Sequence, residues 1–189
     1  MKILKFLLVI FVLIAAAFFI VGMVMPKVEY GHEITVNKSV EEAWAVSEDP
    51  SKHSLWIDGL ESEELISGEK GMPGSKYKVV VNPGEGQDKF EMTETLLERV
   101  PNDHVKMHFD SKDMEFGQSI IFTAKDSSTS SIKTESYIKG KSAMMRSMLG
   151  LMEIFGNSFQ KQEEVNIDKL KGVVDENTTD YFVEVLTDS

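Results

Sequence analysis

The distribution of apolar residues divides the chain into two unequal parts. Phe6–Met25 is a run of 20 residues without a charge, and 14 of them are Leu, Ile, Val or Phe. A helix of this length spans the ~30 Å hydrocarbon layer of a bilayer. We therefore predict that residues 1–26 form an N-terminal transmembrane anchor, that residues 28–172 form one folded domain, and that residues 173–189 form an acidic tail.

A cleaved signal peptide is the alternative interpretation of the first segment. The apolar part of a signal peptide usually has about 7–15 residues and ends at a small-residue cleavage site. Here Ala15–Ala17 lies inside the run, so cleavage there would leave Phe18–Met25 on the product. We expect an uncleaved anchor. Lys2 and Lys5 precede it, and positive residues tend to stay in the cytoplasm, so the domain is expected outside, in a periplasm or at the cell surface.

From residue 60 to residue 140, apolar and polar residues alternate with the period of two that is typical of half-buried strands. Turn residues such as Pro83-Gly84 separate the alternating segments. The pattern predicts an antiparallel meander, with about six to seven strands once an earlier strand is included. The predicted strands are residues 30–36, 60–67, 75–82, 89–99, 105–110, 114–125 and 132–139.

Helical signals lie on both sides of this meander. Two short helices are predicted after the first strand, the first of them capped by Ser39, whose hydroxyl can bond the N–H of Glu42 while the Glu42 carboxylate reaches back. A long helix from Ser142 to about Leu170 has apolar residues on one side only. It is the one predicted element long enough to cover the sheet. The expected fold is α+β, with a curved sheet wrapped on this helix and a gap between them that could hold a ligand.

Several short motifs follow one another in this region. They are the segment SVEEAW from Ser39, the pair Asp49-Pro50, Trp56 before the second strand, the glycines Gly71 and Gly74 before a strand that contains Tyr77, and Val100-Pro101 at a strand end. In these features the chain resembles the SRPBCC superfamily, in particular its START-like and polyketide cyclase/dehydrase-like members. The resemblance implies a helix-grip fold over residues 30–170, with a cavity that holds a sterol, lipid, polyketide or other apolar molecule. The anchor is not part of the family pattern.

Apolar side chains on the inner faces of the strands and of the long helix are the candidates for the cavity wall. Methionine suits such a wall because it is flexible and polarizable, although plain core filling explains the same residues. The predicted lining residues are Trp56, Tyr77, Val79, Phe90, Met92, Met107, Phe109, Phe116, Phe122, Met145, Met148 and Met152.

Glu94 is the candidate for chemistry in the cavity. It lies on the strand face that carries Phe90 and Met92, and burial there would raise its pKa and suit a general acid or base. The alternative is a bulge or an edge position that lets Glu94 reach water. His104 and His108 stand ~13 Å apart on a strand, too far to share a metal. We predict no metal and no cofactor. His53, beside Trp56, could lie at the cavity mouth, but we expect it in a solvated loop.

Charge and composition limit the remaining function classes. The part of the chain after the apolar segment has all 31 acidic and 18 of the 20 basic residues, a net charge of −13. Such a domain repels phosphate backbones, so we predict no nucleic-acid partner. Three interpretations remain: a membrane-anchored, non-enzymatic module that binds a lipid or other small hydrophobic ligand, a cyclase/dehydratase-like enzyme with Glu94 or Tyr77 as acid or base, and a protein-interaction module with a filled cavity.

Overall fold

The computed structural model describes residues 2–82, 84 and 88–182. Part of the turn predicted near Pro83 and the last residues of the predicted tail lie outside this range. In chain order the elements are α1 (Lys2–Val24), β1 (Val28–Tyr30), β2 (Glu33–Val36), α2 (Val40–Ser47), α3 (His53–Trp56), β3 (Leu60–Ser67), β4 (Lys76–Val81), β5 (Phe90–Val100), β6 (His104–Asp110), β7 (Met114–Ala124), β8 (Ser130–Gly140), α4 (Ala143–Gly156) and α5 (Ser158–Asp175).

The strands form one antiparallel sheet with the order β1-β8-β7-β6-β5-β4-β3, in which β2 also pairs with β8. The predicted meander from β3 to β8 is therefore confirmed. The predicted first strand is divided into β1 and β2 around Gly31 and His32. The Gly31 backbone passes so close to the Thr134 carbonyl that a Cβ atom would clash there, and the His32 N–H donates to the Thr134 hydroxyl at 3.0 Å.

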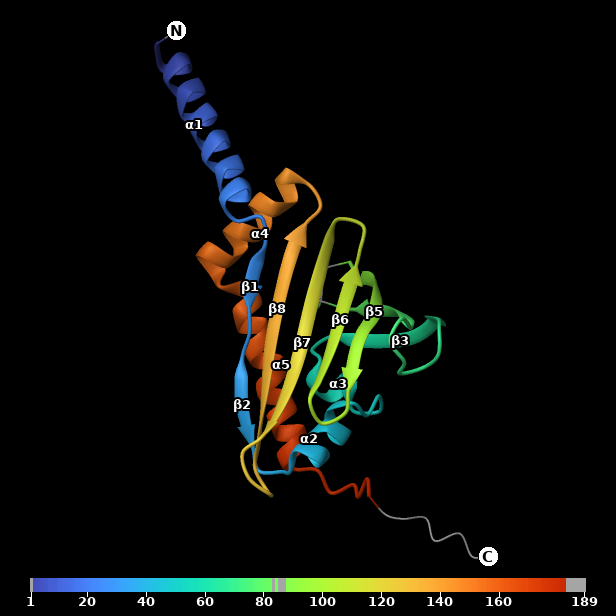
Figure 1. The fold of residues 1–189 in the computed structure, drawn as a ribbon. Helices are drawn as coiled ribbons and strands as arrows, with labels where there is room; N and C mark the ends of the chain where they lie inside the picture. Colours follow the sequence, from blue (N-terminus) through green and yellow to red (C-terminus); the bar gives the residue numbers. More distant parts are fainter. Residues whose placement is uncertain (1, 83, 85–87, 183–189) are drawn as a thin grey trace, which may run out of the picture.

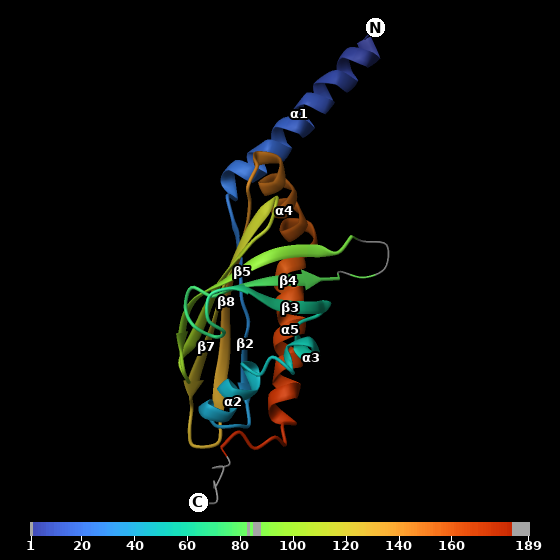
Figure 2. The ribbon, with the colours of Figure 1, turned by 90° about the vertical axis from the view of Figure 1, so that its right-hand side faces the viewer.

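The sheet is strongly twisted, and one helix lies along its inner face. Figure 2 shows β3, β4 and β5 running across the direction of β2 and β8. Ile167, Leu170 and Val174 of α5 are fully buried in the core cluster, together with Val36 and Ile132 of the sheet. A helix cannot follow a sheet that turns away from it, so the two elements separate toward β3–β5.

A long C-terminal helix is present as α5, but the prediction of one unbroken helix from Ser142 to Leu170 is wrong. The helical segment is interrupted at Asn157, which adopts a left-handed conformation with φ 49° and ends α4. The Asn157 N–H still donates to the Glu153 carbonyl at 2.8 Å, and α5 starts in a new direction. Gly and Asn are the residues that end helices in this way, so Gly156-Asn157 was the available sequence signal.

The predicted helix caps are present with one difference. Ser142 accepts from the Met145 N–H at 3.1 Å, and Ser39 accepts from the Glu42 N–H at 3.3 Å. The Glu42 carboxylate does not reach back to the cap. It accepts instead from Lys38 Nζ at 2.7 Å and from Asn177 Nδ2 at 3.0 Å, because α5 brings the end of the chain beside α2.

The end of the domain lies further along the chain than predicted. The boundary expected after residue 172 falls inside α5, which continues to Asp175. Beyond it, the Tyr181 hydroxyl donates to Asp49 at 2.8 Å, and Tyr181 packs against the core cluster. Residues 173–182 are thus joined to the domain rather than separate from it.

Helix α1 projects away from the domain (Figure 1), and in the described part of the chain it is the one helix long and apolar enough to cross a membrane. Nearly all of its side chains are exposed, and Gly22 is its one buried residue. A signal sequence near the N-terminus would also meet these criteria of length and hydropathy. The segment is thus an exposed apolar helix, as either a signal sequence or a membrane anchor would be.

The packing of α5 leads to a stability prediction. Ile167→Ala should lower the free energy of unfolding by about 2–5 kcal/mol, because it leaves a void in the main core. Val165→Ala is the matched control, since Val165 lies on the same helix and is 45% exposed, and it should change stability by less than about 0.5 kcal/mol. Denaturant unfolding of the full chain in detergent measures both. Equal losses would mean that α5 does not face the sheet as described.

Candidate functional site

A cavity of ≈ 340 Å³ lies where α5 and the sheet separate. Its walls come from β3–β8 on one side and from α3 and α5 on the other, with Tyr30 of β1 among the lining residues. The volume is within the range of roughly 300–1,000 Å³ for small-molecule sites. The predicted gap between sheet and helix therefore exists. Of the two C-terminal helices, α5 lines it and α4 does not.

The lining is mainly apolar. Ile57, Leu60, Ile120, Phe159 and Ile167 contribute to it, none of which was predicted from the sequence to line the cavity. The structure also brings eight of the predicted site residues to this cavity: Trp56, Val79, Phe90, Met92, Glu94, Met107, Phe109 and Phe116.

Two aromatic residues predicted for the wall lie elsewhere. Tyr77 is buried, but its hydroxyl accepts from the Gly71 N–H at 2.8 Å and so closes the loop before β4. It is therefore not placed to act as an acid or base in the cavity. Phe122 belongs to the solid core, where its ring packs edge-on against Trp44 with centroids 5.1 Å apart. It sits on β7 at the end that α2 covers.

The three methionines of α4 that were predicted for the wall also lie outside it. Met145 packs beside Val28, Ile138 and Leu149 in a separate small cluster, and the side chains of Met148 and Met152 are exposed. The interruption at Asn157 is the physical reason. It gives α4 a direction different from that of α5, so the apolar face of α4 does not continue the face that covers the sheet.

One end of the cavity carries a group of ionisable side chains. Glu48, His53, Glu63 and Glu94 all line it. His53 Nδ1 lies 2.8 Å from Glu63 Oε2, and the Arg99 Nε donates to Glu48 Oε2 at 2.8 Å. Burial by itself would lower the pKa of His53, but the hydrogen bond and charge of Glu63 outweigh it and raise the pKa. His53 therefore lines the cavity, the alternative to the solvated loop that we expected from the sequence.

Glu94 differs from its acidic neighbours because it has no hydrogen-bond donor among the residues that the structure describes. Its side chain belongs to the buried set, at 9% exposure. Burial, reinforced by the negative charges of Glu63 and Glu48 and opposed by His53, raises the pKa of Glu94 to about 7. At neutral pH it is present both as an acid and as a carboxylate, so it can donate or accept a hydrogen bond within the cavity.

A second polar group at the cavity was not predicted from the sequence. Glu163 of α5 is buried at the cavity wall and accepts from the Ser136 hydroxyl at 3.0 Å and from Gln118 Nε2 at 3.2 Å. Tyr30 lies beside it, and burial and the charge of Glu163 raise the pKa of Tyr30. A signal existed, since Glu163 stands midway between Phe159 and Ile167 at helical spacing and thus on the apolar face of the helix.

Comparison with solved structures identifies the fold. A conserved protein from Geobacillus kaustophilus superposes with a TM-score of 0.63 at 18% sequence identity, over 78% of this chain and 95% of that one. Ara h 8.0201 gives 0.60 at 14% identity, over 80% and 99% of the two chains. The domain has the helix-grip fold of SRPBCC-like proteins. The resemblance seen in the sequence is thereby confirmed at the level of the fold.

A third helix-grip structure is an enzyme with molecules bound. Norcoclaurine synthase from Thalictrum flavum, in complex with dopamine and hydroxybenzaldehyde, gives a TM-score of 0.57 at 17% identity and covers 82% of this chain and 90% of that one. A scan against protein-family models gives no match, and a search of curated protein sequences gives none either. At these identities the comparison establishes the fold and not the activity.

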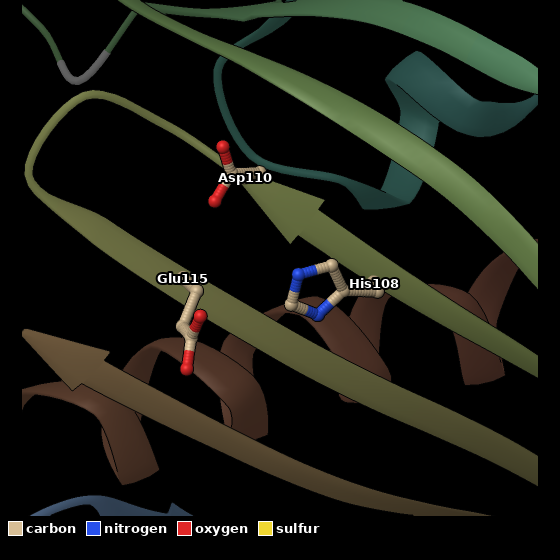
Figure 3. Close-up of side chains that lie close together, drawn as sticks. All are labelled: His108, Asp110 and Glu115. Atoms are coloured by element: carbon tan, nitrogen blue, oxygen red, sulfur yellow. The ribbon is translucent and has the colours of Figure 1, made fainter. Parts of the chain in front are cut away.

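Figure 3 shows a further cluster on the helix-grip sheet, formed by His108 and Asp110 of β6 and Glu115 of β7. Their ligand atoms lie within 4.8 Å of one another. However, Lys139 Nζ lies 2.8 Å from Glu115 and Lys141 Nζ lies 2.7 Å from Asp110. Because both carboxylates already have a cationic partner at the surface, the cluster is accounted for as a set of ion pairs.

The environment of Glu94 gives a pH prediction. In the folded chain Glu94 keeps its proton up to about pH 7, whereas the unfolded chain releases it near the ordinary value of 4.5. Between these values the folded state binds more protons, so the free energy of unfolding falls as pH rises. Glu94→Gln should remove this loss and raise stability at pH 8 relative to the natural chain, by at most about 3 kcal/mol.

The measurement is chemical denaturation of the full chain in detergent from pH 4 to pH 8. Glu91→Gln serves as the control, because Glu91 is on the same strand with an exposed side chain that pairs with Lys78. The difference between the Glu94→Gln variant and the natural chain should grow with pH, while the control should follow the natural chain. A constant difference would show that Glu94 titrates at its ordinary pKa.

Proposed function

We propose that this helix-grip domain binds a small, largely apolar molecule with one polar group, and that α1 holds the domain at a membrane. The observation that carries the proposal is a preformed cavity with an apolar wall in which Glu94 is buried without a partner among the described residues. An unpaired buried carboxyl destabilises the folded protein. A ligand group that bonds it would recover part of that cost.

The size and chemistry of the cavity narrow the class of ligand. A volume of ≈ 340 Å³ is at the small end of known ligand sites, which favours a compact molecule over a whole phospholipid. Phe90, Met92, Phe109 and Phe116 supply flat and adaptable contacts for an aromatic or alicyclic body. The complex of norcoclaurine synthase with dopamine and hydroxybenzaldehyde supports the proposal, because it is a helix-grip protein that holds compact aromatic molecules.

The anchor is proposed on the composition and exposure of α1. Phe6–Met25 has no charge. Exposure of its apolar side chains to water is unfavourable in free energy, whereas their transfer to lipid is favourable. Apolar ligands partition into bilayers, so a tether keeps the cavity near their source. Lys2 and Lys5 before the span favour a cytoplasmic N-terminus and a domain outside the cytoplasm.

A second candidate function is catalysis, and Glu94 is the observation that favours it. A carboxyl group with a pKa of about 7 can both give and take a proton at neutral pH, as a general acid or base must. His53 and Glu63 lie at the same cavity and could hold a second proton. On this proposal the bound molecule would be chemically altered by the natural chain.

Ligand binding is tested by analysis of molecules that co-purify with the full chain. Met92→Trp should reduce the bound species at least about tenfold, because the indole occupies the volume that the ligand needs. Met72→Trp is the matched control, since Met72 is exposed and does not line the cavity. Organic extracts of equal amounts of the three proteins are compared by mass spectrometry.

Equal recovery from all three proteins would contradict the proposal. It would mean that the molecules bind outside the cavity, for example to the exposed surface of α1. If a species is recovered, it is returned to the natural chain and to Glu94→Gln. Conversion by the natural chain alone would favour the enzyme. Retention without conversion by both would favour a binding module.

The orientation is tested with a reporter enzyme that is active only outside the cytoplasm, fused to the C-terminus. We expect activity from the full chain and none from the same fusion without residues 6–25, because the anchor also directs export. An expressed but inactive full-length fusion would place the domain in the cytoplasm.

A further inference from the structure

Helix α4 has no part in the function proposed above. Its apolar residues do not line the cavity, and the helix packs instead against α1 and the end of β8. Figure 1 shows α4 directly beside the last turns of α1. The exposed side chains of α4 therefore stand next to the segment that we propose enters the membrane.

The exposed surface of α4 is apolar throughout. Each of its exposed residues is apolar: Ala143, Met144, Met148, Met152, Ile154 and Phe155. Met144 is 66% exposed and Phe155 is 84% exposed. The surface helix of a soluble domain normally turns polar residues outward, and α5 does so with Lys161, Gln162, Asp168 and Lys169.

Both charged residues of α4 are directed away from this apolar face. The Arg146 Nε donates to the Gly22 carbonyl of α1 at 3.4 Å. The Glu153 carboxylate accepts from the Phe159 N–H at 3.0 Å, across the interruption between α4 and α5. The face that remains thus carries neither a charge nor a strong hydrogen-bonding group, although the domain around it is strongly acidic.

Small residues fix the depth of α4 relative to α1. A Cβ atom at Gly22 would clash with the Ser147 hydroxyl, and one at Gly150 would lie 2.8 Å from Val21 Cγ1. The two backbones therefore approach closely, as small residues allow between helices in membranes. Val21 and Gly22 lie within about 6 Å of the end of the apolar run, at 1.5 Å per residue. Ser147 and Gly150 of α4 consequently lie beside the last turn of the apolar run, which is the level of the membrane interface if α1 is the proposed anchor.

We propose that α4 is an interfacial helix whose outer face, formed by Met144, Met148, Met152 and Phe155, is inserted into the leaflet next to the domain. The inference rests on the proposed anchor. The occupant is the lipid bilayer itself, because the face is continuous with α1, lacks charge and lies at the interface level. Helices of this kind bury their apolar side about 5–10 Å into the boundary between headgroups and acyl chains.

This arrangement fixes the domain on the membrane at two elements rather than one. Phe159 stacks on Tyr30 with ring centroids 5.9 Å apart and lines the cavity, and it stands four residues from Phe155. The inserted face and the cavity wall are therefore joined by the short turn at Asn157. The domain is held so that the end of the cavity lined by Tyr30 and Phe159 is directed toward the lipid.

The chain contains no cysteine, so single spin labels can be placed in an otherwise unmodified full-length protein. Labels at Phe155→Cys and Met148→Cys report on α4, Leu13→Cys reports on the anchor, and Val165→Cys is the apolar, exposed control on α5. The protein is reconstituted in phosphatidylcholine vesicles. The collision of each label with oxygen, which concentrates in lipid, and with a water-soluble nickel complex is then measured.

The expected result is a lipid-like response at positions 13, 148 and 155, with depths of about 5–10 Å for the two α4 labels, and a water-like response at position 165. A water-like response at 148 and 155 with a lipid-like response at 13 would overturn the inference and leave the anchor standing. Labels on α4 that neither reagent reaches would also overturn it, because protein, such as a second copy of the chain, would then cover the face. A water-like response at 13 would overturn the anchor and the inference together.

Discussion

The structure depends on how one helix buries an apolar face in a twisted sheet. Ile167, Leu170 and Val174 are fully buried in the core cluster between α5 and the sheet, and the burial of these apolar side chains stabilises the domain. The same helix is straight, while the sheet turns away from it through β5, β4 and β3 (Figure 2). The cavity is therefore a consequence of the way α5 packs on the twisted sheet. No additional structural element is needed to form it.

The cavity concentrates acidic groups in a region of low dielectric constant. Glu163 is compensated by two hydrogen bonds, and Glu48 and Glu63 by Arg99 and His53. Glu94 faces the same space without such a partner among the described residues. A polar group that is left unpaired beside a preformed apolar cavity costs stability and is typical of positions where function, rather than folding, determines the residue.

Asn157 divides the C-terminal region into two helices with different surroundings. On one side of it α5 covers the sheet and supplies the cavity wall. On the other side α4 packs on the end of α1 through Gly22, Ser147 and Gly150 and turns Met144, Met148 and Met152 outward. One left-handed residue thus separates the surface that grips the sheet from the surface that we propose meets the lipid.

The sequence by itself determined the strands, the apolar first helix and the inward side of β5, because a period of two fixes which side chains share a face. Phe90, Met92 and Glu94 were therefore assigned together correctly to one face. Only the tertiary structure decided that Met148 and Met152 point away from the cavity. It also decided that Tyr77 bonds the loop before β4, that Phe122 packs in the core and that His53 lines the cavity. Periodicity orders residues within one element, whereas the direction of a helix after a left-handed residue and the partner of a buried hydroxyl depend on contacts between elements far apart in the chain.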